Sequence, residues 1–429
     1  MNSIAIAILL ISFFILLFLR VPISYCLGIS AVLTAMYINI PLALLAQAMV
    51  RGINSFSLLA IPFFILAGEI MSEGGISRRL IAFSNAIVGR IRGGLAMVNV
   101  LASMFFGGIS GSSVADTSSI GSIMIPMMKE KGYDTDYSVA VTITGSTQGI
   151  LIPPSHNMII YSLVAGGVSV GKLFLAGVVP GISLGIALMI AAYIIAVKRK
   201  YPRGRKMTFK EGLIATRDSF FGLFTFVIVV VGVVSGLYTA TEAAAVAAVY
   251  AFIVTFFIYR EIPLSKMGVI LIKSLKTLSI VMALIATSNA FGFMLAFLKI
   301  PALATNALLS ISSNKIVILL VINVLLLFLG CIMDMAPLIL ITTPILLPVA
   351  MKIGVDPVHF GIIMMLNLSV GLLTPPVGST LFVGCALGDI PIEKLSKAMI
   401  PFYITMVIVL MIITYIPQIV MFMPNFFMP

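Results

Sequence analysis

The sequence is poor in charged residues, which excludes a large soluble domain. Only 9% of its 429 residues are charged, 61% are hydrophobic, and the mean hydropathy is +1.22. A soluble domain carries about 25% charged residues because its surface faces water. The apolar stretches here run for about 20 residues between short polar breaks, which is the length that crosses a bilayer as a helix. We therefore predict an all-α integral membrane protein.

Cysteine and acidic residues are also scarce. Cys26, Cys331 and Cys385 are scattered in apolar runs, a spacing that indicates neither a metal site nor a disulfide and favours a packing role. The 14 acidic residues are outnumbered by 26 basic ones, which gives a net charge of +12. In a membrane protein Lys and Arg gather in cytoplasmic loops beside anionic headgroups. Membrane lipid, and not nucleic acid, is thus the expected partner of this charge.

The apolar runs predict about ten membrane spans and two re-entrant hairpins. No basic residue precedes the first run and no small-residue cleavage site follows it, so we expect a retained span. The hairpins are expected near 98–127 and 316–350, where Gly, Pro and polar residues interrupt the apolar sequence. The spans are expected near 2–19, 22–38, 54–72, 135–165, 173–197, 218–236, 240–258, 277–297, 357–386 and 398–420.

The distribution of basic residues supports this topology. With Arg20 in the cytoplasm, only five of the 26 Lys and Arg lie outside, namely Arg51, Lys172, Lys299, Lys315 and Lys352. The positive-inside rule predicts such an asymmetry, and a full crossing by either hairpin would remove it. Both termini are then predicted to be periplasmic. The longest polar insertion, 198–217, is interpreted as a solvated cytoplasmic loop.

A repeat with an offset of 222 residues relates the two halves. Between 108 and 176 it needs no gap, and it matches Gly149 with Gly371 and Pro153-Pro154 with Pro375-Pro376. The topology opens the first hairpin to the cytoplasm and the second to the outside, so we expect inverted repeats, an architecture of secondary transporters. We predict N-terminal scaffold spans in 1–50, the first repeat in 51–200, a cytoplasmic loop with linking spans in 201–270, and the second repeat in 271–429.

The candidate chemistry lies in the two hairpins and in the broken spans 135–165 and 357–386. Irregular backbone survives at membrane depth only where protein or water covers it. Each Pro-Pro pair removes backbone donors, so nearby carbonyls lose their helical partners. Free carbonyls suit a small hard cation, and a helix that resumes after a break presents N–H groups to an anion. Pro-kinked packing helices are the alternative, which four matched breaks disfavour.

Few acidic residues fall within the apolar segments. Asp334, at the tip of the second hairpin, is the strongest candidate because an intramembrane carboxylate is costly and usually functional. It could ligate sodium, carry a proton or cap a helix start, and we favour sodium. Asp116 is expected to steady the first hairpin by local hydrogen bonds. Glu69 is expected at the interface, and Glu242, three residues after Thr239, in a capping box.

Other function classes explain the sequence less well. Residues 108–111 have the G-x-S-G form of intramembrane serine proteases, with Ser110 as nucleophile and His156 as a candidate base. A duplicated, inverted architecture has no part in that chemistry, so an enzyme is not expected. A channel would place its filter on an oligomeric axis, whereas two half-sites occur here within one chain. A sodium/proton antiporter of similar architecture is a further alternative.

The chain resembles the large membrane subunit of the tripartite ATP-independent periplasmic (TRAP) transporters, in the ion transporter superfamily. The resemblance covers essentially the whole chain. It rests on SGSSVADTSSIG at 110–121, IPMMKEKGYD at 125–134, TGSTQGILIPPS at 144–155, TATEAAAVAA at 239–248 and LLTPPVG at 372–378.

The resemblance implies two sodium sites, each between a hairpin tip and the adjacent broken span, and a substrate site between the tips. The first sodium site is expected around Ser103, Gly108, Ser110, Gly149, Ile152 and Pro154. The second is expected around Gly330, Asp334, Gly371, Thr374 and Val377. The substrate is expected near Ser112, Ser113, Asn157 and Ser379.

The resemblance also implies a physiological setting. A bacterial inner-membrane elevator would import a small organic acid with sodium as coupling ion and without another cofactor. A soluble periplasmic binding protein would deliver the acid, and a small four-helix membrane subunit would be a separate chain. Family substrates include sialic acid, C4-dicarboxylates and other sugar or keto acids, of which we favour sialic acid.

Overall fold

The computed structural model describes residues 2–204, 207–312 and 314–428, and within these ranges the chain is helical and has no β-strand. The N-terminal helices are α1 (Asn2–Phe18), α2 (Ile23–Tyr37) and α3 (Leu42–Ile53). The next group comprises η1 (Phe56–Leu59), α4 (Ala60–Glu73), α5 (Ile76–Val88), α6 (Gly94–Ser110), α7 (Ser113–Glu130), α8 (Thr135–Gln148), α9 (His156–Val164) and α10 (Val170–Lys198).

The linking region consists of α11 (Phe209–Val234), α12 (Ala240–Ile253), the π-helix η2 (Val254–Tyr259) and η3 (Leu264–Lys266). The C-terminal group comprises α13 (Met267–Phe297), α14 (Ile300–Ile311), α15 (Lys315–Gly330), α16 (Met335–Lys352), α17 (Pro357–Gly371), α18 (Ser379–Gly388), α19 (Ile392–Tyr415) and α20 (Pro417–Phe427). Of the loop predicted at 198–217, residues 205 and 206 lie outside the described residues.

The two predicted hairpins are the helix pairs α6–α7 and α15–α16, and the two predicted broken spans are α8–α9 and α17–α18. Adding 222 to the bounds of α7 gives the bounds of α16, and the same offset carries the start of α8 onto the start of α17. The breaks are related by this offset too, which carries Pro153-Pro154 onto Pro375-Pro376, and each pair has a cis peptide bond. The sequence repeat is therefore a repeat of helices. The domain boundaries at 50, 200 and 270 stay predictions.

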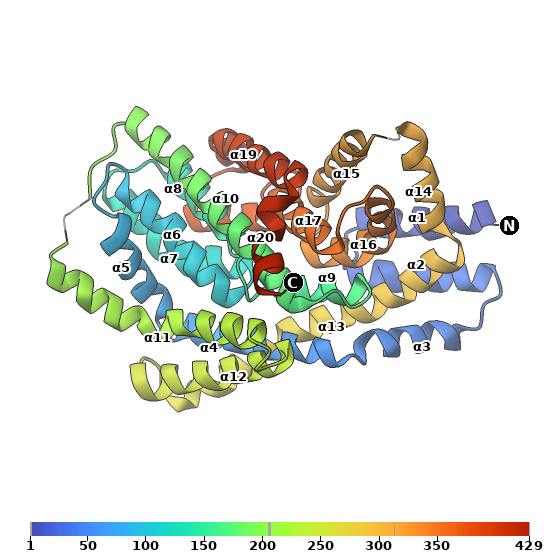
Figure 1. Cartoon of the computed structure of the whole chain (residues 1–429), viewed down its shortest axis with the longest axis horizontal. Helices are drawn as coiled ribbons and strands as arrows, with labels where there is room; N and C mark the ends of the chain where they lie inside the picture. Colours follow the sequence, from blue (N-terminus) through green and yellow to red (C-terminus); the bar gives the residue numbers. More distant parts are fainter. Residues whose placement is uncertain (1, 205–206, 313, 429) are drawn as a thin grey trace.

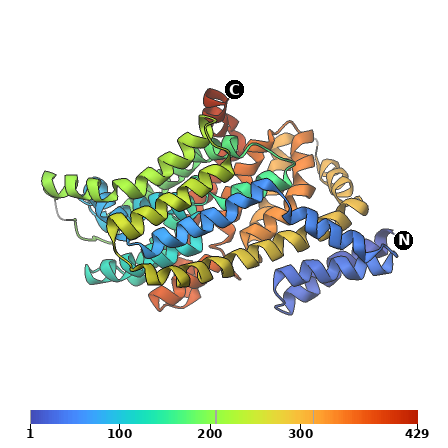
Figure 2. The ribbon, with the colours of Figure 1, turned by 90° about the horizontal axis from the view of Figure 1, so that it is seen from below.

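The long helices form a layer on which the hairpins and broken helices rest. The layer lies along the lower edge of Figure 1 and comprises α3, α4, α11, α12 and α13. Figure 2 shows the same helices from below, where they run obliquely side by side. Within this layer α4 packs against α12 and α13, and α13 also packs against α2 and α3. The N terminus lies at one end of the long axis and the C terminus near its middle (Figure 1).

The two broken spans interlock above this layer. The second half of each span packs on the other hairpin, α9 on α16 and α18 on α7. The Thr380 hydroxyl of α18 donates to Ser113 Oγ of α7 at 3.2 Å, and the Tyr161 hydroxyl of α9 donates to the carbonyl of Pro357 in the other broken span at 2.6 Å. A movement of one hairpin therefore involves the broken span of the other half.

Seven helical segments in the described residues are long and apolar enough to cross a membrane. Six fall on predicted spans, and the seventh, α16, is an arm of the second hairpin. Of the remaining predicted spans, 2–19, 22–38 and 357–386 contain shorter apolar helices, and 135–165 contains the short helices α8 and α9. The chain is thus an all-α, multi-pass membrane protein.

Some element bounds differ from the prediction. The helix predicted at 277–297 begins at Met267, and the one predicted at 218–236 begins at Phe209. Both helices extend into segments rich in Lys and Arg, which a hydropathy pattern assigns to loops. Lys and Arg are nevertheless good helix formers, and their long side chains can reach water from the end of a helix. The span predicted at 398–420 ends at Tyr415, before α20 starts at Pro417.

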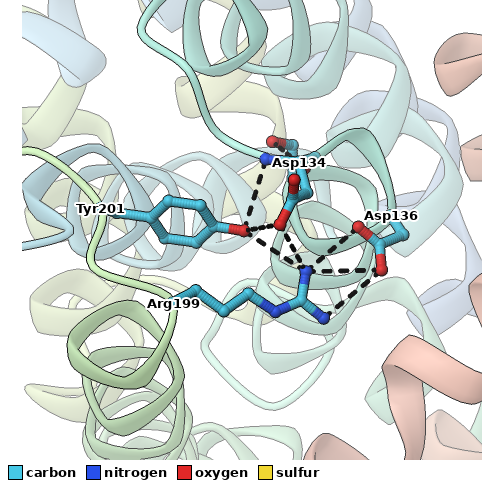
Figure 3. A network of polar contacts seen from close by, with 5 residues as sticks. Asp134, Asp136, Arg199 and Tyr201 are labelled. Carbon is cyan, nitrogen blue, oxygen red and sulfur yellow. Dashed lines mark hydrogen bonds and ion pairs between the residues drawn. The ribbon is translucent and has the colours of Figure 1, made fainter.

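A polar cluster fixes the end of α10 to the start of α8 (Figure 3). Arg199 Nη1 lies 2.9 Å from Asp134 Oδ2 and 3.2 Å from Asp136 Oδ1. The Tyr201 hydroxyl donates to Asp134 Oδ2 at 2.6 Å, and this bond is the main cause of a lowered pKa for the Asp134 carboxyl. The cluster stabilises the turn after the first hairpin.

Candidate functional site

The tip of the first hairpin and the first broken span are in backbone contact. A Cβ on Gly149 would lie 2.3 Å from the Cα of Gly107, so only glycine permits the approach. One residue further, a Cβ on Gly108 would lie 3.0 Å from Ile152 Cγ2 and 3.2 Å from the carbonyl oxygen of Pro153. The predicted residues Gly108, Gly149 and Ile152 thus belong to one small region.

The remaining residues predicted for the first sodium site border the same region. A Cβ on Gly111 would lie 3.1 Å from the carbonyl oxygen of Pro154, beside the predicted residue Ser110. Ser103 of α6 is buried against α8, where a Cβ on Gly145 would lie 3.5 Å from its hydroxyl oxygen. Around the break the structure supplies carbonyl and hydroxyl oxygens, which are the ligands that a small hard cation prefers.

The second hairpin meets the second broken span in the same way. A Cβ on Gly371 would lie 2.5 Å from the Cα of Gly330. The N–H of Val377 donates to the carbonyl of Cys331 at 3.1 Å, and the Thr374 hydroxyl donates to the carbonyl of Val370 at 2.8 Å.

Asp334 completes this second region. It is the N-cap residue of α16, and its Oδ1 accepts a hydrogen bond from the Ser379 hydroxyl at 3.2 Å. All five residues predicted for the second sodium site therefore lie at the contact of hairpin and break.

One residue of each region, Ser110 in the first and Asp334 in the second, lines a common cavity of about 560 Å³. Its walls come from α4, the tips of both hairpins, the start of α9 and the N-terminal half of α13. Three of the four predicted substrate residues, Ser112, Ser113 and Asn157, line it, and the fourth, Ser379, is bonded to the lining residue Asp334. The cavity is thus shared by the two repeats.

Buried hydroxyl groups of α7 and α8 form hydrogen bonds with one another beside the first hairpin tip. Ser113 Oγ lies 2.6 Å from Ser146 Oγ, and the Thr117 hydroxyl donates to Ser146 Oγ at 2.9 Å. Ser113 is only 2% exposed and also accepts the bond from Thr380. Of the predicted substrate residues, Ser113 is therefore tied into the wall, whereas Ser112 is half-buried and caps α7.

The expectation for Asp116 is wrong. Instead of steadying the hairpin by local hydrogen bonds, it is fully buried in α7, and in the part of the chain that the structure describes neither carboxylate oxygen has a hydrogen-bond partner. The buried Ser103 hydroxyl lies beside this carboxylate, but in a geometry that does not make a regular hydrogen bond. A buried carboxylate needs a compensating partner, which a proton or a cation would supply. Sequence reasoning missed this because burial depends on how α6, α7 and α8 pack.

The protease geometry is not formed. Ser110 Oγ interacts with the backbone of Ser112, accepting from its N–H at 3.4 Å, and no hydrogen bond joins it to His156 among the described residues. His156 is instead packed beside Gly111, where a Cβ would lie 3.2 Å from Nδ1. A nucleophile without a base in reach is not activated.

Two charged residues that line the cavity were not predicted there. Glu69, expected at the interface, lies on the cavity wall, and Lys273, expected in a loop, lies within α13. Lys273 Nζ is 3.0 Å from Glu69 Oε2 and 3.2 Å from Glu73 Oε1. By contrast, the capping box of Glu242 is confirmed, since Thr239 N donates to Glu242 Oε2 at 2.7 Å.

Comparison with known sequences gives a consistent family. Residues 10–419 match the family described as the tripartite ATP-independent periplasmic transporter, DctM component. The chain is 44% identical over 421 residues to the uncharacterized protein YgiK of Salmonella typhimurium, covering 97% of each. It is 43% identical to the C4-dicarboxylate TRAP transporter large permease protein DctM of Pseudomonas aeruginosa, covering 86% of each. It is 39% identical to the sialic acid TRAP transporter large permease protein SiaM of Vibrio cholerae, covering 89% of this chain and 90% of that one.

The fold is also found in a solved membrane transporter. The YdaH transporter of Alcanivorax borkumensis superposes with a TM-score of 0.62 at 12% identity, covering 87% of this chain and 88% of that one. At that identity the likeness shows the fold alone, that of an all-α membrane transporter.

Proposed function

This chain belongs to the DctM family of tripartite ATP-independent periplasmic transporters, and on that premise we propose that it imports a small organic acid together with sodium. Its relatives are permeases, so it is a transporter and not an enzyme. The observation that carries the proposal is the cavity of about 560 Å³, which residues of both hairpin tips line. A site shared by two inverted halves can be exposed to either side of the membrane in turn.

Sodium is proposed at the two contacts between hairpin and break. Support comes from backbone carbonyls and hydroxyls gathered around Gly108 and Ile152 and around Thr374 and Val377. A cation near the first contact would also offset the unpartnered carboxylate of Asp116. In a low-dielectric site each ion would be held by the charge or dipole of several oxygens.

The transported acid is proposed to bind between the tips, near Ser112 and Asn157. There the N-termini of α7 and α9 present N–H groups to an anion. Relatives are named for C4-dicarboxylates and for sialic acid at similar identity, so the comparison does not single out sialic acid. Succinate and N-acetylneuraminate are the two probes to compare.

The proposed transport cycle is an elevator movement in the inner membrane. The hairpins and broken helices would move as a unit against the layer of α3, α4 and α11–α13, since the cavity lies between the two. A small four-helix subunit would join that layer, and a periplasmic binding protein would deliver the acid. Both termini are proposed to be periplasmic.

Reconstituted uptake tests the proposal. Proteoliposomes that hold the chain with its small subunit receive binding protein and labelled succinate or N-acetylneuraminate. We expect uptake with an inward sodium gradient and none with a proton gradient in sodium-free buffer. Equal uptake with a proton gradient alone would contradict sodium coupling. Flux that proceeds without any gradient or binding protein would favour the channel.

A further inference from the structure

The cavity has one basic side chain among the described residues that line it, Lys273 of α13. The other ionisable lining residues are Glu69, His156 and Asp334. The lining thus holds two carboxylates and one ammonium group, so the wall as a whole does not favour an organic anion. Lys273 is therefore the side chain best able to attract one.

Lys273 is held from one side by the layer helix α4. Its Nζ lies 3.0 Å from Glu69 Oε2 and 3.2 Å from Glu73 Oε1, and the spacing of four residues places both carboxylates on the same face of α4. An ammonium group has three donors on a rotatable carbon–nitrogen bond, so it can exchange one acceptor for another while it keeps the second. The Lys273 side chain is 53% exposed, which leaves it accessible from the cavity.

The two carboxylates are not equally placed. Glu69 lines the cavity and its side chain is 19% exposed, whereas Glu73 is not part of the lining and is 42% exposed. Exposed ion pairs contribute little because water screens them and long side chains lose entropy when paired. The bond to Glu73 can thus be exchanged at small cost, while Glu69 keeps Lys273 in position.

We propose that Lys273 is an exchangeable binding point for the anionic group of the transported acid, which takes the place of Glu73 on the ammonium. This rests on the proposed function and adds a residue of the layer to a site otherwise built from the hairpins. The flexible stem of lysine lets one ammonium turn from a carboxylate of the protein to one of the ligand. In the competing explanation, the pair only ties α4 to α13.

The two explanations predict different signs for two charge-removing variants. If Lys273 receives the ligand, Lys273→Gln weakens binding and Glu73→Gln strengthens it, because Glu73 competes for the ammonium. If the pair is only a tie, both variants break it and shift binding in the same direction. Lys276 lies on the same helix, three residues further on, and does not line the cavity, so Lys276→Gln is the matched control.

The measurement is equilibrium binding of labelled succinate and N-acetylneuraminate to the purified permease complex in saturating sodium. For whichever acid the wild type binds, we expect the Kd to rise about tenfold in Lys273→Gln, as for loss of a charge-assisted contact. In Glu73→Gln we expect it to fall about two- to threefold, as for loss of a weak competitor. Lys276→Gln should leave it unchanged.

Several outcomes would overturn the inference. They are a Kd within twofold of wild type in Lys273→Gln, weaker binding in Glu73→Gln, or no binding of either acid by the wild type. If Lys273→Gln does not fold, the sign of the Glu73→Gln effect still decides. Uptake is measured separately on the same preparations: binding without sodium-driven uptake contradicts the proposed function alone, and uptake with an unchanged Lys273→Gln Kd contradicts the role of Lys273 alone.

Discussion

Asp334 and Thr374 differ in what each offers to a cation at the second contact. Asp334 would contribute a full negative charge, although it is exposed to the cavity and already accepts a bond from Ser379. The Thr374 hydroxyl donates to Val370, which leaves its lone pairs free to accept. The loss of one hydroxyl contact costs about 1–3 kcal/mol, and the loss of a charged ligand costs more.

We therefore predict that both Asp334→Asn and Thr374→Val raise the sodium concentration for half-maximal uptake, and that Asp334→Asn does so more strongly. Thr374→Val should insert normally because it makes the span more apolar. Sodium titration of uptake at matched membrane levels provides the measurement. If neither variant changes the titration, the second contact is only a kink.

Some residue contacts could be predicted from the sequence and others could not. The hairpins and Pro-Pro breaks could be predicted from local patterns that repeat, and the resemblance to the family implied that Gly371, Thr374 and Asp334 share one contact. The pairing of Lys273 with Glu69 could not, since the two are far apart in the chain and meet only through the packing of α4 on α13.

At the scale of elements, the second hairpin and the second broken span are in contact at Gly330 and Gly371. We predict that Gly371→Ala reduces sodium-dependent uptake at least tenfold, because its Cβ would lie 2.5–2.9 Å from the backbone of Gly330 and must separate the two elements. The control is Gly268→Ala, where a Cβ meets nothing within 4 Å. Uptake and membrane levels are compared for both. Normal uptake by Gly371→Ala would show that this contact does not shape the site.

Element existence could be predicted better than element bounds. The hairpins and breaks lie where their Gly, Pro and hydroxyl residues indicate, and the repeat offset reproduces the bounds of α7 and α16. The start of α13 at Met267 could not be read from hydropathy, because Lys273 is stabilised within a helix by carboxylates of another element.

At the scale of the whole molecule, the charge distribution predicts an orientation that labelling can test. In a background without native cysteines, we predict that Lys315→Cys reacts with an impermeant maleimide in intact spheroplasts. Lys210→Cys should react only after lysis, since its segment is assigned to the cytoplasm by its basic residues. Both positions are exposed in the structure. Reversed accessibility of the pair would invert the proposed topology.

The offset of 222 residues has one more consequence. If the halves are inverted copies, every difference between their backbones is also a difference between a gate facing in and the same gate facing out. The backbone of 94–198 is then a template for 316–420, and the reverse holds as well. If each repeat is rebuilt on the backbone of the other, the result is a structure of the same chain at the opposite end of the transport cycle. Distances between α4 and α16 in that second structure could then be compared with distances measured between spin labels on these two helices.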